Sequence, residues 1–378
     1  MKAKETLDAH LKARIGELRR EQASGRKIVG YYPAEYMPEE LVLASGAIPL
    51  GLARGGDSSS VAYSGSYIHR WMDSFCRGQI GARMMKEDPY YQIVDLYVAP
   101  VVDMNVHAVA DCWTFFSDAN VFKMAVPHEK TDRALDFFHQ RLFWLRQKLE
   151  ELTGNKITDE KLKESIVLCN KERKALRDIS LLRKAERLPI SGFDFIQLNH
   201  FSYIADKKTM VDVLEAYYEE LKNKDAPVFT GPRILFTGST LAMGDYKVHE
   251  LVAEAGGDIV IEQFSEALKD YWDDVQVEGD LMENLAYRYF MKKVCHGVFV
   301  PGKERLEFIV KLAKDFKVNG VIWYQPMYRD SFDMEAYYFP RMLKEGANLP
   351  SLQLETDYDT LEKRSFETRI ETFLEAVC

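Results

Sequence analysis

The sequence has few cysteines, and their spacing excludes several kinds of site. No two of them form a CxxC pair, so zinc ribbons and thioredoxin-type redox motifs are excluded. An odd number of cysteines spread over a large acidic chain also argues against a disulfide framework. The cysteines are therefore free thiols, or some of them bind a metal. The five are Cys76, Cys112, Cys169, Cys295 and Cys378.

The chain also lacks an excess of positive charge and a long apolar run. Its formal net charge is -9, from 50 Lys and Arg against 59 Asp and Glu, and it contains no basic stripe that would bind a phosphate backbone. No stretch approaches the roughly 18 apolar residues of a membrane span. The N-terminus has no apolar core of the kind that a signal peptide needs. We therefore expect a cytoplasmic protein that binds neither nucleic acid nor a membrane.

The usual nucleotide-binding fingerprints are missing too, since neither GxGxxG nor GxxxxGK[ST] occurs. The junction FTGSTLAMGD, residues 236–245, follows an expected strand and precedes an expected helix. Ser239 and nearby backbone N–H groups could therefore meet an anion at the helix N-terminus. Glycines at such junctions more often serve only the turn, so Ser239 is a weak candidate for cofactor binding.

The length and the pattern of the chain predict two α/β domains. At 378 residues, the chain exceeds the roughly 250 to 300 residues at which one hydrophobic core stops growing. Strand and helix patterns alternate over residues 25–130 and again over 226–378, which predicts two doubly wound parallel sheets. Residues 131–225 read as long amphipathic helices that form a connector associated with the first domain, and residues 1–24 as a separate N-terminal helix.

Two of the expected helices are long, one over about residues 66–85 and one over about 280–291. Ligands of doubly wound sheets bind beyond the carboxyl ends of the strands. The cleft between the two domains is therefore the expected site.

Acidic residues follow the first expected strand. Glu39 and Glu40 lie beyond the carboxyl end of this strand, in YYPAEYMPEE at residues 31–40. A carboxylate there could act on a substrate proton. They are candidate catalytic residues. Acidic residues in the first turn of a helix also complement the helix dipole, and this structural explanation is the more common one.

Cys76 is the strongest single candidate among the cysteines. It lies in SFCRGQIGARMM, residues 74–85, beside Arg77 and near an expected helix start. The helix dipole and a neighbouring positive charge stabilise a thiolate, which suits metal ligation or nucleophilic attack. A lone cysteine is more often inert packing.

These stretches, in this order, resemble the 2-hydroxyacyl-CoA dehydratase family, which includes the benzoyl-CoA reductase subunits. The likeness covers nearly the whole chain. The resemblance implies a subunit of two flavodoxin-like α/β domains with a helical portion, working in a dimer. It rests on VGYYPAEYMPEELVLASGAIPLGL, SFCRG, RILFTG, YWDDVQVEGDLMENLAYRYFMKKVC, NGVIWYQ and LPSLQLETDYDTLEKRSFETRIETFLEAV.

The resemblance further implies the chemistry. Subunits of this family hold a [4Fe-4S] cluster through three cysteines in the interdomain cleft and act on a CoA thioester. A separate ATP-hydrolysing iron-sulfur activator protein supplies one electron at low potential. In the dehydratases this electron forms a ketyl radical on the thioester, and in the reductases it drives ring reduction.

Carried over residue by residue, the implied set of ligands is incomplete. The three positions fall on Cys76, on Asp103 in APVVDMN and on Arg329 in GVIWYQPMYRD. Aspartate can ligate iron, but arginine carries only donors and stays protonated, so Arg329 cannot be a ligand. We expect Arg329 to bind an anionic part of a CoA ester or to stabilise a reduced neighbouring centre, or else to fill the site with a salt bridge to Asp103. A rearranged metal site of Cys76, Cys112 and Cys295 is a further hypothesis.

The expected function is that of an acyl-CoA dehydratase or reductase subunit, which acts with a homologous second subunit in a homodimer or heterodimer and with the activator. Two alternatives stay open. One is a cluster-poor, non-catalytic partner or scaffold subunit. The other is a reductase of another small substrate at an unusual multi-iron cluster.

Overall fold

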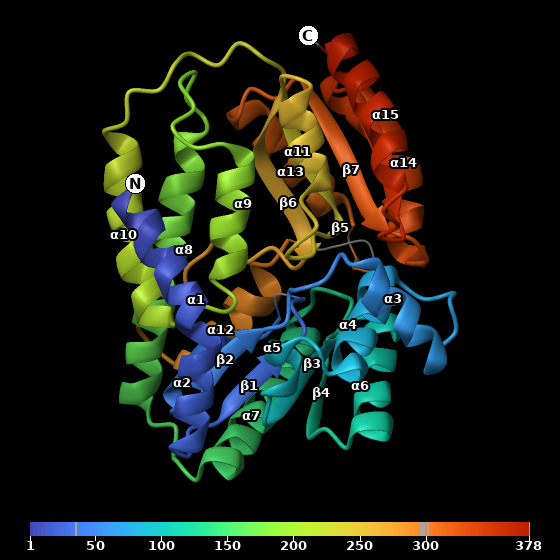
Figure 1. Ribbon diagram of the computed structural model, residues 1–378. Helices are drawn as coiled ribbons and strands as arrows, with labels where there is room; N and C mark the ends of the chain where they lie inside the picture. Colours follow the sequence, from blue (N-terminus) through green and yellow to red (C-terminus); the bar gives the residue numbers. More distant parts are fainter. Residues whose placement is uncertain (35, 295–298, 301, 378) are drawn as a thin grey trace.

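Two four-stranded sheets, each with all strands parallel, form the two halves of the computed structural model (Figure 1). The structure describes residues 1–34, 36–294, 299–300 and 302–377. Helices flank both sheets, and the predicted α/β class with two doubly wound parallel sheets is confirmed.

The first sheet has the strand order β2-β1-β3-β4. Each strand is short, and all but the edge strand β4, in which only Met124 is buried, are buried along nearly their whole length. The helices that follow the strands begin near the carboxyl edge of the sheet. The strands are β1 (Ile28–Tyr31), β2 (Ile48–Gly51), β3 (Leu96–Val101) and β4 (Val121–Ala125). The helices are α2 (Glu39–Ala44), α3 (Ser58–Tyr63), α4 (Ser74–Met85), α5 (Pro89–Gln92) and α6 (Met104–Ser117).

The second sheet has the order β6-β5-β7-β8 and is covered on both faces. One face packs against α11 and α15, and the other against α13 and α14. The strands are β5 (Arg233–Thr240), β6 (Asp258–Glu266), β7 (Gly320–Pro326) and β8 (Ser351–Thr356). The helices are α11 (Lys247–Glu254), α13 (Lys303–Asp315), α14 (Asp330–Ala347) and α15 (Glu362–Val377).

The helical segment between the sheets contacts both of them. Helix α7 packs against β4, whereas α9 packs against β6 of the second sheet, and α1 lies along α10 (Figure 1). No described helix has both the length and the apolar character needed to cross a membrane. The domain bounds given above stay a prediction. The helices are α1 (Lys2–Ala23), α7 (Asp132–Thr153), α8 (Asp159–Leu182), α9 (Gly192–Phe201) and α10 (Lys207–Lys222).

Two of the expected helices differ in the structure. The helix expected from residue 66 begins only at Ser74, because the side chain of Asp73 caps α4 by accepting a hydrogen bond from the Cys76 amide at 2.8 Å. The helix expected over 280–291 is α12 (Leu281–Ala286), followed by one turn of π-helix, Tyr287–Met291.

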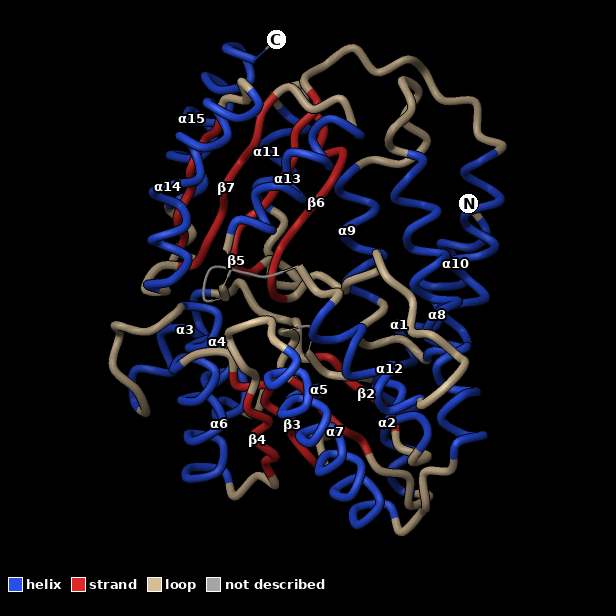
Figure 2. The backbone as a smooth tube through the Cα atoms, turned by 180° about the vertical axis from the view of Figure 1, so that it is seen from behind, coloured by secondary structure: helices blue, strands red, loops and turns tan. Residues whose placement is uncertain are grey.

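The carboxyl ends of the two sheets face each other across the loops between them (Figure 2). Backbone hydrogen bonds cross this boundary: the Ala267 amide donates to the Pro33 carbonyl at 2.8 Å, and the Met243 amide donates to the Ala53 carbonyl at 2.7 Å. Residues that follow β1 and β6 are therefore held in contact, and the boundary is closely packed there. At the Met243 contact, a hollow of about 620 Å³ is lined from both halves, by Arg54 and Tyr91 and by Tyr246.

Candidate functional site

A buried arginine lies at the centre of this boundary. Arg329 precedes α14, and its side chain is 1% exposed. Its guanidinium donates two hydrogen bonds to the carboxylate of Glu266, and its Nε donates to Asp103 at 2.8 Å. The carboxylate of Asp73 lies 3.8 Å away. One cation therefore faces three carboxylates, and the salt bridge expected between Arg329 and Asp103 is present.

Helix capping places two of these carboxylates. Asp103 precedes α6 and accepts hydrogen bonds from the amides of Asn105 at 3.0 Å and Val106 at 3.1 Å. Asp73 caps α4 in the same way. Aspartate is favoured at this position because its carboxylate satisfies amide groups that the helix leaves unpaired. Capping thus holds one oxygen of each carboxylate and leaves the other to face Arg329.

Cys76 lies beside this cluster as a fully buried thiol. Its Sγ is 3.3 Å from the Tyr32 hydroxyl, which donates to Glu266 at 2.8 Å. Burial raises the pKa of Cys76 well above its ordinary value, and the nearby Asp73 carboxylate raises it further. Arg77, expected to stabilise a thiolate, instead donates to the Arg70 carbonyl at 3.0 Å. The structure therefore favours the protonated thiol.

The charge of Asp73 is sensitive to pH. Burial raises its pKa to about 6, although Arg329 acts in the opposite direction. Among the described residues, its Oδ2 has no hydrogen-bond partner. Because the carboxylate lies in a low-dielectric environment close to Glu266, its ionised form is costly.

A second buried charge cluster surrounds Glu39. The Tyr31 hydroxyl donates to Glu39 at 2.6 Å, and Lys207 bridges Glu39 and Glu172 at 2.6 Å each. Lys269 lies 2.9 Å from Glu39. Although burial opposes ionisation, these lysines hold the pKa of Glu39 well below its usual range. Glu39 is therefore a carboxylate that is fully occupied by two cations.

Glu40 is the neighbouring member of this second cluster. Its fully buried carboxylate accepts hydrogen bonds from Arg173 and, at 2.8 Å, from the Tyr289 hydroxyl. Since Tyr31 contacts the Glu39 cluster and the adjacent Tyr32 contacts Cys76, the two clusters lie on either side of the chain at the end of β1. The catalytic role of Glu39 and Glu40 stays a prediction.

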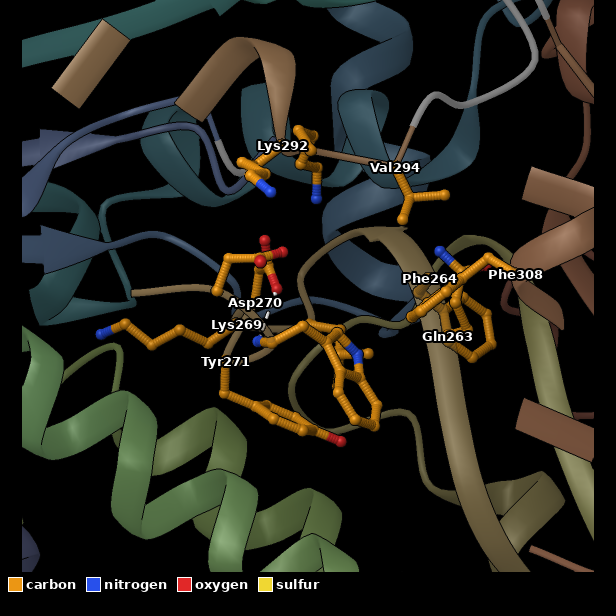
Figure 3. Close-up of a pocket in the computed structure, with 12 residues that line it drawn as sticks. Gln263, Phe264, Lys269, Asp270, Tyr271, Lys292, Val294 and Phe308 are labelled. Atoms are coloured by element: carbon orange, nitrogen blue, oxygen red, sulfur yellow. Dashed lines mark hydrogen bonds between the residues drawn. The ribbon is translucent and has the colours of Figure 1, made fainter. Parts of the chain in front are cut away.

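Two small cavities adjoin the second cluster. The first, about 40 Å³, is lined by Glu39, Glu172 and Lys269 among others. The second is of the same size and shares Lys269 and Asp270 with it. In Figure 3, Lys292 points into this second cavity from the side opposite Asp270. Each cavity has room for water-sized groups only.

Two of the remaining candidate residues, Ser239 and Cys112, are among the described residues. Ser239 is fully buried within β5, and its hydroxyl has no hydrogen-bond partner in the described part of the chain. Cys112 follows Asp103 by nine residues of α6, which separates them by roughly 13 Å. It lines a surface hollow together with Phe115 and Phe116. Cys295 lies outside the described residues.

Comparison with known proteins identifies the family. Residues 35–377 match the sequence model described as 2-hydroxyglutaryl-CoA dehydratase, D-component. The chain belongs to this family. It is 25% identical to the (R)-phenyllactyl-CoA dehydratase beta subunit of Clostridium sporogenes over 94% of this chain and 93% of that protein. It is 24% identical to a benzoyl-CoA reductase subunit of Thauera aromatica, over 82% and 81%, and 24% identical to the (R)-2-hydroxyglutaryl-CoA dehydratase beta subunit of Acidaminococcus fermentans, over 94% of each.

The residues of this family member do not fit the cluster that the resemblance implies. Of the three expected positions, only Cys76 offers a sulfur donor, while Asp103 is bound to Arg329. The guanidinium itself has no acceptor and occupies the space among the carboxylates. Across the residues that the structure describes, no group of three or more His, Cys, Asp or Glu side chains could hold a metal ion.

The sequence reasoning missed Glu266, the principal partner of Arg329. Glu266 is the last residue of β6, a strand that is buried from Ile259 to its end. A carboxylate at the carboxyl end of a buried parallel strand is costly unless a cation binds it. The position of Glu266 at the end of a buried strand could therefore have predicted a second acidic partner for Arg329.

Proposed function

We propose that this chain is a subunit of a 2-hydroxyacyl-CoA dehydratase or benzoyl-CoA reductase-like system in the cytoplasm. In this proposal it acts on an acyl-CoA together with a homologous second subunit and does not itself carry a cluster. One observation carries this choice: Arg329, bound to Glu266 and Asp103, occupies a position where the family resemblance implies a cysteine ligand of the cluster.

The physical argument concerns the donor set. Iron-sulfur clusters are usually held by cysteine thiolates. Here the one cysteine at the site is a buried thiol, and both carboxylates are bound by the guanidinium. The partner subunit would then hold the cluster and accept an electron from an ATP-hydrolysing iron-sulfur activator. The present chain would complete the dimer.

The names of the relatives support a role in a larger assembly. Two are called beta subunits of acyl-CoA dehydratases and one is called a subunit of a benzoyl-CoA reductase. This chain covers most of the length of each of them. Reduction or dehydration of a CoA thioester is therefore the reaction class that we propose for the assembled system.

The test is anaerobic co-expression of this chain with a homologous subunit that has all three cysteines. Iron, sulfide and electron paramagnetic resonance signals are measured for each chain after separation. We expect iron on the partner only, and turnover of 2-hydroxyacyl-CoA or benzoyl-CoA only with both chains, activator and ATP present. Stoichiometric iron on this chain that is lost in Cys76→Ala would contradict the proposal.

A further inference from the structure

Glu266 makes several interactions at the domain boundary in addition to its ion pair with Arg329. Its carboxylate is fully buried. Besides Arg329, it accepts hydrogen bonds from the Tyr32 hydroxyl at 2.8 Å and the Thr240 hydroxyl at 2.9 Å. Tyr32 belongs to the first sheet region and Thr240 to the second. Glu266 therefore ties the two halves of the chain through one carboxylate.

We propose two linked roles for Glu266. Its charge favours the Arg329 guanidinium in the interdomain site and disfavours an iron-sulfur cluster there, and its hydrogen bonds latch the two domains together. This inference rests on the proposed function in one respect only, namely that this chain carries no cluster. It assigns a role to a residue that is neither a cluster ligand nor a group that acts on substrate.

The selectivity follows from charge. A cluster together with its thiolate ligands carries a net negative charge, so an additional buried carboxylate beside it is electrostatically repelled and lowers its reduction potential. Replacing Asp103 and Arg329 by cysteine would restore three sulfur donors with Cys76. It would also remove the cation that neutralises Glu266, and an uncompensated buried carboxylate would then face anionic ligands.

The latch follows from the positions of the partners. Asp103 and Tyr32 come from the first sheet region, whereas Arg329 and Glu266 come from the second. The Ala267 amide, next to Glu266, donates to the Pro33 carbonyl, next to Tyr32. Side-chain and backbone bonds therefore cross the boundary at the same place, and loss of the Glu266 charge weakens both.

The first test compares Asp103→Cys/Arg329→Cys with the same double variant carrying Glu266→Gln. Both are reconstituted anaerobically with ferrous iron and sulfide, and their iron content and electron paramagnetic resonance spectra are measured. We expect a cluster only in the triple variant. Equal iron in the double variant would overturn the inference, as would a triple variant that is folded by circular dichroism and takes up no iron. Iron in the unmodified chain would instead contradict the proposed function.

The second test does not depend on the cysteine variants. Glu262 is a matched control, because it is also fully buried on β6 and accepts two hydrogen bonds from Arg183 at 2.8 Å each. Glu266→Gln is expected to accelerate amide hydrogen exchange by roughly tenfold or more at Ala267, whose amide crosses the boundary to the Pro33 carbonyl. Glu262→Gln is expected to leave Ala267 protected. Equal protection of Ala267 in both variants would overturn the latch.

Discussion

Replacing Arg329 by methionine removes the guanidinium that binds Glu266, and its cost can be worked from the structure. Arg329 is 1% and Glu266 0% exposed, so the substitution leaves a fully buried carboxylate without this cation. Breaking a buried ion pair in this way costs about 3 to 5 kcal/mol. We expect that loss in the free energy of unfolding, measured by urea denaturation at pH 7 and followed by circular dichroism.

A second substitution separates charge from packing. The double variant Arg329→Met/Glu266→Met removes both charges of this ion pair. It is therefore expected to be more stable than Arg329→Met alone, in which the Glu266 carboxylate stays buried without its cation. Arg341→Met on α14, the helix that Arg329 precedes, is the control, since its side chain is 79% exposed and solvent screens its pair with Glu345. The reasoning is refuted if Arg329→Met costs no more than Arg341→Met, or if the double variant is less stable than the single one.

Three further outcomes are expected. Lys207→Met should lower the free energy of unfolding in urea by about 3 kcal/mol, because two buried carboxylates lose one of the two lysines that they share and keep only Lys269. Lys156→Met, at a side chain 84% exposed, should cost about 1 kcal/mol or less; equal costs would contradict this. Burial raises the pKa of Asp73 to about 6, above the roughly 3.9 of an unfolded chain. Its ionisation therefore lowers stability as pH rises through that interval, and Asp73→Asn should stabilise more at pH 8 than at pH 5; the same gain at both would argue against it. Maleimide labelling mapped by mass spectrometry should modify Cys76 and Cys169 at pH 8 only after unfolding, since both thiols are buried; native labelling of Cys76 at the unfolded rate would count against it.

The alternation of strands and helices could be predicted because it depends on local patterns of apolar residues. The sequence predicts the start of α4 in two places, near Cys76 from the SFCRG stretch and at about residue 66 from the apolar pattern, and the structure confirms the first because Asp73 caps the helix. The capping carboxylate of Asp73 determines where α4 begins. How much this cap stabilises the helix end depends on how deeply Asp73 is buried, which a single sequence does not show.

The site could be predicted in part. The family resemblance drew attention to Asp103 and Arg329, and their opposite charges predicted the salt bridge that the structure contains. Glu266 was missed because its partner lies 63 residues away and Tyr32 lies 234 residues away. Pairings over such separations leave no local periodicity in a single sequence.

The two adjacent tyrosines at the end of β1 set a limit on how this chain can vary. Tyr31 contacts Glu39, and Tyr32 contacts Glu266 and Cys76. Because successive residues of an extended chain point in opposite directions, deletion of one residue from β1 would move Tyr32 to the position of Tyr31 and leave the Glu266 cluster without a phenol. Insertions and deletions should therefore be tolerated in the loops around β1 but not within it, so its length is fixed by two polar centres at once.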